Sequence, residues 1–253
     1  MEEKPILIQG AIDIELDYLI NIIKEREEVE IGTYKYYKGL IDGYPVVVSK
    51  TKIGQTNAGA ATSIAILKYS PLLIINQGTA GGHGRIIHKG DIVIGKDYIN
   101  LTAFRINRRE EGSGSDLSGW KMRAFYTDKQ HHIYNVADER LLEITRELKD
   151  EYKNGTIYEG RIASGEIWNR ESDRIMYIYN TYKTLCEEME TGAVYTIAKN
   201  FNIPVIGIRV ITNNEVLKEI YDNEYAKKLA TDCQMFVEKV VKKSIKNINE
   251  FKV

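Results

Sequence analysis

Cysteine and histidine are scarce in this chain, and their scarcity excludes two kinds of protein. The two cysteines, Cys186 and Cys233, are too few for a framework of disulfide bridges, and neither lies in a CxxC motif or a Cys/His cluster. The four histidines have no metal-ligand spacing. We therefore expect a protein of a reducing compartment, and we expect no metal site.

An excess of one charge and long apolar runs are also lacking. Lys and Arg number 35 against 36 for Asp and Glu, which leaves a net charge of −1. A protein that neutralises a nucleic-acid backbone usually carries a clear basic excess, so we expect no nucleic-acid partner. No apolar stretch approaches the roughly 20 residues that a membrane-spanning helix needs, and no signal peptide precedes the first strand-like run. The sequence thus predicts a cytoplasmic protein without a membrane partner.

Short apolar runs alternate with longer helical patterns, which is typical of an α/β layer fold. With 43% of its 253 residues hydrophobic, the chain can bury a sizeable core. The pattern predicts strands over residues 5–9, 33–40, 44–50, 72–76, 91–95, 162–167 and 205–211, and helices over 14–23, 57–68, 187–193 and 223–248. The Gly- and Ser-rich segment 110–119 lies between ordered patterns, so we interpret it as a loop insertion in a single domain of residues 1–253.

Polar and glycine residues follow several of these strands, where ligand sites of open α/β sheets gather. Each has an ordinary structural explanation: Glu15 is typical of the first turn of a helix, and Trp168 is typical of a core. Glu190 alone is typical of a solvated helix, and Asn213 alone is typical of a turn. The run Gly78–Gly82 predicts a tight turn or a phosphate cradle, but it has neither the P-loop ending nor the GxGxxG spacing. A dinucleotide-dependent enzyme is therefore set aside, and no cofactor is expected.

Taken together, the order and spacing of these motifs are specific. The sequence resembles the methylthioadenosine/S-adenosylhomocysteine nucleosidases, which are members of the nucleoside phosphorylase superfamily. The resemblance rests on Gly10-Ala11 with Glu15, Gly78-Thr79-Ala80-Gly81-Gly82, Lys89-Gly90-Asp91-Ile92-Val93, Ser164-Gly165, Glu188-Met189-Glu190, and Ile203-Pro204 to Arg209. It extends from about Ile6 to Asn213 and the closing helix, and it fails only between about Asn107 and Phe125, where this chain is longer. It implies a three-layer α/β/α fold around a central mixed β-sheet.

The resemblance also implies an activity, cleavage of the bond between a purine and its ribose. The sugar passes through an oxocarbenium-like state, so the site must hold the ribose, neutralise the departing base and supply a nucleophile. Glu15 would be the general base on the attacking water, with Thr79 and Arg209 helping to position it. Glu190 would bind the ribose hydroxyls through charge-assisted hydrogen bonds, and Met189 would pack under the sugar.

The remaining substrate contacts implied by the resemblance lie around the base and the 5′ substituent. Trp168 takes the place of an aromatic residue that stacks on the purine, and the backbone at Asn169 would read the edge of the base. Ile12 and Ile53 would line the 5′ side of the sugar. Phe104 resembles a residue that family members lend to the pocket of a neighbouring subunit, which implies a homodimer or a higher homo-oligomer.

Asn213 departs from the family, whose members have at this position an aspartate that protonates the leaving base. An amide donates one hydrogen bond and accepts another, but it cannot deliver a proton. General-acid assistance contributes about 10²–10⁴ in rate. An amide also suits a 6-oxopurine, whose N7 and O6 are both acceptors, so the sequence leaves adenine and 6-oxopurine nucleosides open. It also leaves open a non-catalytic purine-binding protein, although the retained Glu15 and Glu190 argue against one.

Water is favoured over phosphate as the nucleophile. Phosphorolysis needs an anion site, usually several arginines beside the ribose. The strand end that would carry one reads Asn76-Gln77, and the first loop has Asp13 and Glu15, which would repel phosphate. A purine nucleoside phosphorylase remains the alternative, because four arginines lie nearby in sequence: Arg85, Arg105, Arg108 and Arg109.

Overall fold

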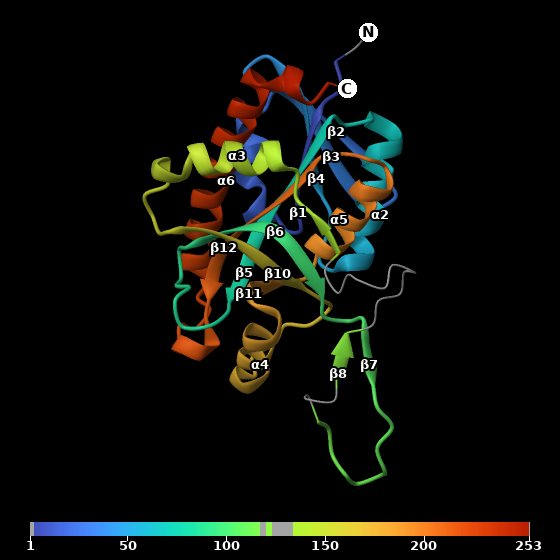
Figure 1. Ribbon diagram of the computed structural model, residues 1–253. Helices are drawn as coiled ribbons and strands as arrows, with labels where there is room; N and C mark the ends of the chain where they lie inside the picture. Colours follow the sequence, from blue (N-terminus) through green and yellow to red (C-terminus); the bar gives the residue numbers. More distant parts are fainter. Residues whose placement is uncertain (1–2, 117–119, 123–133, 253) are drawn as a thin grey trace.

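The computed structural model describes residues 3–116, 120–122 and 134–252. Among these residues, ten strands form one mixed sheet, in the order β11-β10-β6-β12-β5-β1-β4-β3-β2, with β9 paired to β6 (Figure 1). The bounds of the strands are β1 Ile6–Gly10, β2 Lys24–Ile31, β3 Tyr34–Ile41, β4 Tyr44–Lys50, β5 Leu73–Gly82, β6 Ile92–Asn100, β9 Tyr134–Val136, β10 Ile157–Ser164, β11 Thr184–Glu188 and β12 Val205–Asn213. The predicted central mixed sheet is confirmed.

The sheet folds back on itself at one end. Strand β11 is parallel to β10, and it also pairs antiparallel to the end of β5. Because β5, β12, β6, β10 and β11 are joined in turn, these five strands close into a ring. The closure brings the last residues of β5, β11 and β12 side by side.

Helices cover both faces of the sheet, as the implied three-layer arrangement requires. Helices α3 (Glu139–Glu147) and α6 (Asn223–Lys246) lie on one side in Figure 1, and α2 (Gln55–Tyr69) and α5 (Thr191–Asn200) lie on the other. The short helix α1 (Asp17–Ile22) packs on α6, and α4 (Ser172–Tyr182) contacts β11. No helix in the described ranges is long and apolar enough to cross a membrane.

The hairpin of β3 and β4 was predicted correctly, but strand β2 was missed. Asp42 and Gly43 connect β3 to β4 with φ of 48° and 77°, the left-handed conformation that a two-residue hairpin turn requires. Strand β2 is mostly charged and exposed, and it pairs with β3 at the edge of the sheet. An edge strand that buries so little apolar surface leaves no alternating hydrophobic pattern in the sequence.

Three other sequence expectations need correction, and the first is the strand predicted over 162–167, which is β10 and spans Ile157–Ser164 instead. The run Gly78–Gly82 is neither a turn nor a cradle, because β5 continues through it and is paired on both sides, with β12 and β11. The predicted helix over 187–193 begins later, since Glu187 and Glu188 still belong to β11. The carboxylate of Glu188 accepts hydrogen bonds from the backbone N–H groups of Glu190 and Thr191, which are the first donors of α5.

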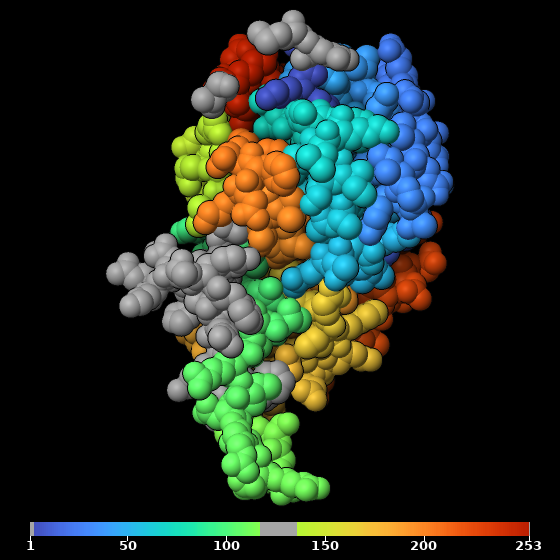
Figure 2. All heavy atoms as spheres, turned by 90° about the vertical axis from the view of Figure 1, so that its right-hand side faces the viewer, coloured from blue at the N-terminus to red at the C-terminus, as the bar shows by residue number. Residues whose placement is uncertain are grey.

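The predicted loop insertion lies on a segment that projects from the body of the protein. Strands β7 (Phe104–Ile106) and β8 (Trp120–Met122) form a separate two-stranded sheet. Figure 2 shows residues 104–116 extending away from the rest of the surface. The remaining positions of the predicted insertion, 117–119, lie outside the described residues.

Candidate active site

A cavity of about 170 Å³ opens at the carboxyl ends of the strands. The loop after β1, the end of β5, the loop after β10 and the ends of β11 and β12 form its walls. Most of the site residues expected from the sequence line it: Ile12, Glu15, Ile53, Thr79, Trp168, Asn169, Met189, Glu190 and Asn213. The fold thus assembles one pocket from residues that are far apart in the sequence.

Glu15 is held rigidly in the wall of this cavity. Its Oε2 accepts hydrogen bonds from the backbone N–H groups of Ala11 (2.8 Å) and Ile12 (3.3 Å). Its Oε1 accepts from the N–H (2.8 Å) and the hydroxyl (3.0 Å) of Thr79. A side chain at Gly78 would place its Cβ 2.7 Å from Oε1, so only glycine lets the carboxylate reach β5. Four donors therefore fix this carboxylate in one orientation, and two of them come from Thr79.

Glu190 enters the same cavity from the N-terminus of α5. It is 9% exposed, and its Oε1 accepts a hydrogen bond from the backbone N–H of Gly54 at 2.8 Å. Burial and the negative charges of Glu188 and Glu15 together raise the pKa of this carboxyl to about 8, although the charge of Arg209 opposes the rise. A carboxyl with so few solvating partners is suited to accept hydrogen bonds from ligand hydroxyls.

Arg209 does not line the cavity, contrary to the role in positioning water that the sequence implied. Its guanidinium is 1% exposed and lies 2.7 Å from a carboxylate oxygen of Glu188. It also donates to the backbone and side-chain oxygens of Asn76 and to the hydroxyl of Thr191. None of these partners is Glu15. Arg209 thus neutralises Glu188 beneath the site, and Glu188 in turn anchors the start of α5, where Glu190 lies.

One end of the cavity carries aromatic and amide side chains. Trp168 is 66% exposed, and its ring meets that of Tyr221 edge-on, with centroids 5.6 Å apart. The side chain of Asn213 is buried, and its Nδ2 donates to Glu215 at 3.3 Å. Asn169 is also buried, and its Oδ1 accepts from the backbone N–H of Glu171. This end offers a flat apolar surface with amides beside it.

Sequence reasoning missed several residues of the cavity, among them Glu187 and Tyr221. Glu187 was placed only in the helix predicted over 187–193, and Tyr221 stands in the segment before α6 without any local signal. His83, behind the cavity, was missed as well; its Nε2 lies 3.1 Å from Oε2 of Glu187. The positions of Glu187 and His83 depend on the pairing of β11 with β5, which the sequence does not reveal.

Phe104 lies outside the cavity of its own chain. It begins β7, and its ring centroid is 6.4 Å from that of Tyr182 in α4. Phe104 is therefore not part of the cavity that most of the other expected site residues line.

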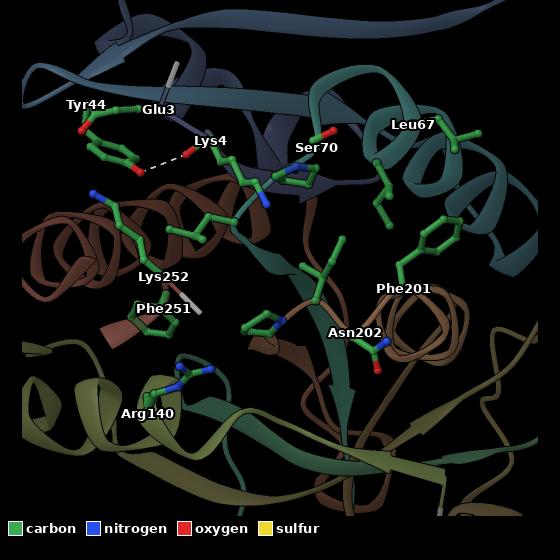
Figure 3. Close-up of a pocket in the computed structure, with 15 residues that line it drawn as sticks. Glu3, Lys4, Tyr44, Leu67, Ser70, Arg140, Phe201, Asn202, Phe251 and Lys252 are labelled. Carbon is green, nitrogen blue, oxygen red and sulfur yellow. Dashed lines mark hydrogen bonds between the residues drawn. The ribbon is translucent and has the colours of Figure 1, made fainter. Parts of the chain in front are cut away.

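A second, larger cavity of about 750 Å³ lies near the amino ends of the strands (Figure 3). Lys4, Leu72 and Pro204 line it just before β1, β5 and β12 begin. Figure 3 shows Tyr44 beside Lys4, and its hydroxyl donates to the Lys4 carbonyl at 2.9 Å. This cavity has no buried carboxylate, so the smaller one is the better candidate for chemistry.

The closed ring of strands, with a cavity beside it that is lined by four buried glutamates, defines an α/β protein of the nucleoside phosphorylase type. The family model described as "Phosphorylase superfamily" matches residues 5–246. The chain belongs to this superfamily.

Several of the similar proteins are nucleosidases, while one similar solved structure is the futalosine hydrolase of Helicobacter pylori strain 26695 (TM-score 0.80, 20% identity, covering 95% of this chain and 98% of that one). The chain is 29% identical over 213 residues to the 5′-methylthioadenosine/S-adenosylhomocysteine nucleosidase of Anoxybacillus flavithermus, covering 82% of this chain and 84% of that protein. It is 30% identical, with the same coverage, to the nucleosidase of that name from Geobacillus sp.. The crystal structure of the Neisseria meningitidis nucleosidase in complex with methylthio-immucillin-A has a TM-score of 0.80 and 22% identity, covering 95% of this chain and 100% of that one.

Proposed function

We propose that this protein hydrolyses the N-glycosidic bond of a purine nucleoside of the methylthioadenosine/S-adenosylhomocysteine type and releases the purine base. The observation that carries the proposal is the placement of Glu15 and Glu190 in one cavity, each fixed by backbone donors. The names of the similar proteins support the same activity. We also propose that residues 1–253 act as a single domain.

In the proposed reaction, water attacks C1′ of the ribose as the bond to the purine breaks. Glu15 accepts the proton of the water, and Thr79 holds Glu15 in place. The purine leaves with the electron pair of the broken bond and takes up a proton from solvent water, because the amide of Asn213 can donate a hydrogen bond but not a proton. Glu190 accepts hydrogen bonds from the ribose hydroxyls, while Met189 packs under the sugar. These contacts strengthen as positive charge develops on the sugar, because that charge favours the ionised form of Glu190 and because backbone donors already hold both acids in place.

The base and the 5′ substituent occupy the two ends of the cavity. Trp168 stacks on the purine, the backbone at Asn169 binds its edge, and the amide of Asn213 donates to N7. Ile12 and Ile53 line the 5′ side; Ile53 is 53% exposed, so this side is open to a substituent.

Water is the nucleophile because the cavity lacks an anion site. No Arg or Lys is among the described residues that line it, and Arg209 is engaged by Glu188 beneath it. Arg108 and Arg109, two of the arginines that could supply a phosphate site, pair with Glu110 and Asp116 on the projecting segment. Phosphate would therefore meet a cavity lined by four glutamates, of which only Glu188 is paired with an arginine.

The active unit is proposed to be a homodimer or a higher homo-oligomer. Phe104 stands on the projecting β7, outside the cavity of its own chain, as a residue lent to a neighbouring pocket would.

Chromatography of reaction mixtures tests the proposed function. Purified protein incubated with 5′-methylthioadenosine or S-adenosylhomocysteine should release free base, whereas the Glu190→Gln variant should release at least a hundredfold less. Intact nucleoside after prolonged incubation with the wild-type protein would overturn the proposal.

A further inference from the structure

The strongest unexplained feature of the cavity is a buried pair formed by Glu187 and His83. The side chain of His83 is 1% exposed and that of Glu187 is 8% exposed. Nε2 of His83 lies 3.1 Å from Oε2 of Glu187, and Nδ1 lies 2.7 Å from the hydroxyl of Thr184. The ring is thus held at both nitrogens, and it can present an N–H to the carboxylate. The proposed reaction does not use either residue.

Glu187 and Asn213 face each other across a glycine. In the ring of strands, Gly81 of β5 pairs with Glu187 of β11 on one side and with Asn213 of β12 on the other. Neighbouring strands lie about 4.8 Å apart, so the two Cα atoms are separated by roughly 10 Å. Directly paired residues project to the same face of a sheet, and both side chains line the cavity. Gly81 leaves the space between them open for the edge of a planar base.

The hydrogen bonds of Glu187 indicate what it can offer a ligand. Besides His83, the side-chain amide of Asn169 donates to the same oxygen, Oε2, at 3.4 Å. No hydrogen bond from any described residue reaches Oε1. A carboxylate that already has donors on one oxygen presents the other oxygen as an acceptor. Glu187 therefore offers an acceptor between Asn169 and Asn213.

We propose that Glu187, oriented by His83, is the specificity-determining residue at the base end of the cavity and selects a 6-aminopurine over a 6-oxopurine. The inference rests on the proposed function, in which the backbone at Asn169 binds the edge of the base and Asn213 binds N7. An acceptor between these two contacts lies at the substituent on C6.

The chemistry of the two kinds of base gives the direction of the selection. Adenine has an acceptor at N7 and a donor at its exocyclic amine, which suit Asn213 and Glu187 respectively. A 6-oxopurine has acceptors at both N7 and O6, so its O6 would face Oε1 of Glu187 without a proton between them. A site that is built to bond one substrate group rejects an analogue that lacks it, here by at least about 100-fold in kcat/KM.

Kinetics with a matched pair of substrates test the proposal. The substrates are 5′-methylthioadenosine and its 6-oxo counterpart, 5′-methylthioinosine, and the variants are Glu187→Gln and the control Glu171→Gln, an exposed acid before α4. The wild-type protein should prefer the amino compound by at least about 100-fold in kcat/KM. Glu187→Gln should narrow this ratio at least about tenfold, since its amide N–H can donate to O6. Glu171→Gln should leave the ratio unchanged.

The outcome that overturns the proposal is a wild-type protein that cleaves both compounds equally, or a Glu187→Gln variant in which both rates change in proportion.

Calorimetry with free adenine and hypoxanthine gives a second readout that does not depend on catalysis or on the folding of a variant. Adenine should bind the wild-type protein more tightly than hypoxanthine; equal affinity contradicts the role of Glu187. If neither nucleoside is cleaved but adenine is preferred, the proposed function fails while the selection by Glu187 stands.

Discussion

Replacing Glu190 by glutamine should stabilise the free protein as the pH rises, although it removes a residue of the proposed site. Burial and the nearby carboxylates of Glu188 and Glu15 raise the pKa of Glu190 from 4.5 to about 8. The folded protein then binds more protons than the unfolded chain between these two values, so its stability falls as the pH rises through this window. Below the window the wild-type protein does not suffer this loss, and above it the loss is complete.

The magnitude follows from the same values. One pKa unit corresponds to about 1.4 kcal/mol, so the shift from 4.5 to about 8 predicts that the variant gains up to about 5 kcal/mol over wild type between about pH 5 and pH 8. Glutamine keeps the size of the side chain and an oxygen for the Gly54 N–H. The gain therefore reports the loss of the charge alone.

Urea unfolding at several pH values measures this effect, with Glu171→Gln as the control because that residue is exposed. The stability curves of wild type and Glu190→Gln should diverge as the pH rises, while those of wild type and the control should stay parallel. Parallel curves for wild type and Glu190→Gln would refute the reasoning, since Glu190 would then ionise as readily in the folded protein as in the unfolded chain.

Three further variants test separate parts of the site. Glu15→Gln should lower turnover at least about a hundredfold, which initial rates measure. It should also destabilise the fold by about 1–3 kcal/mol in thermal unfolding, because the amide nitrogen of the glutamine would face a backbone N–H. Arg209→Leu should destabilise by about 3–5 kcal/mol in urea unfolding, because it leaves Glu188 buried without its cation, and a loss below about 1 kcal/mol contradicts that pairing. Asn213→Asp should cleave adenine nucleosides faster at low pH, with a new fall in rate as the pH rises, because a buried aspartate can donate the missing proton. Equal or slower cleavage at every pH in a pH–rate profile removes Asn213 from the leaving-group position.

The α/β class and the strand ends that form much of the cavity could be predicted because their signals are local. Buried strands such as β1 and β12 are apolar runs; Glu15 and Trp168 follow strands, and Asn213 ends one. The family resemblance then supplied roles that no single residue would have indicated.

The rest depends on pairing between distant strands, which leaves no local trace. The closure of β11 on β5 turns the expected turn at Gly78–Gly82 into a strand and brings Glu187 beside Asn213. The same closure buries Arg209 under Glu188, where the guanidinium neutralises the buried carboxylate of Glu188. Strand β2 was missed for the opposite reason, since its exposed charges contribute nothing to the core.

The proposed hydrolysis is tested most directly by identifying the sugar that 5′-methylthioadenosine yields with and without inorganic phosphate. Mass spectrometry should detect free 5-methylthioribose, formed at the same rate in both buffers, because no described cation lines the cavity to bind phosphate. Base release that requires phosphate and yields the sugar 1-phosphate would contradict the account and identify a phosphorylase.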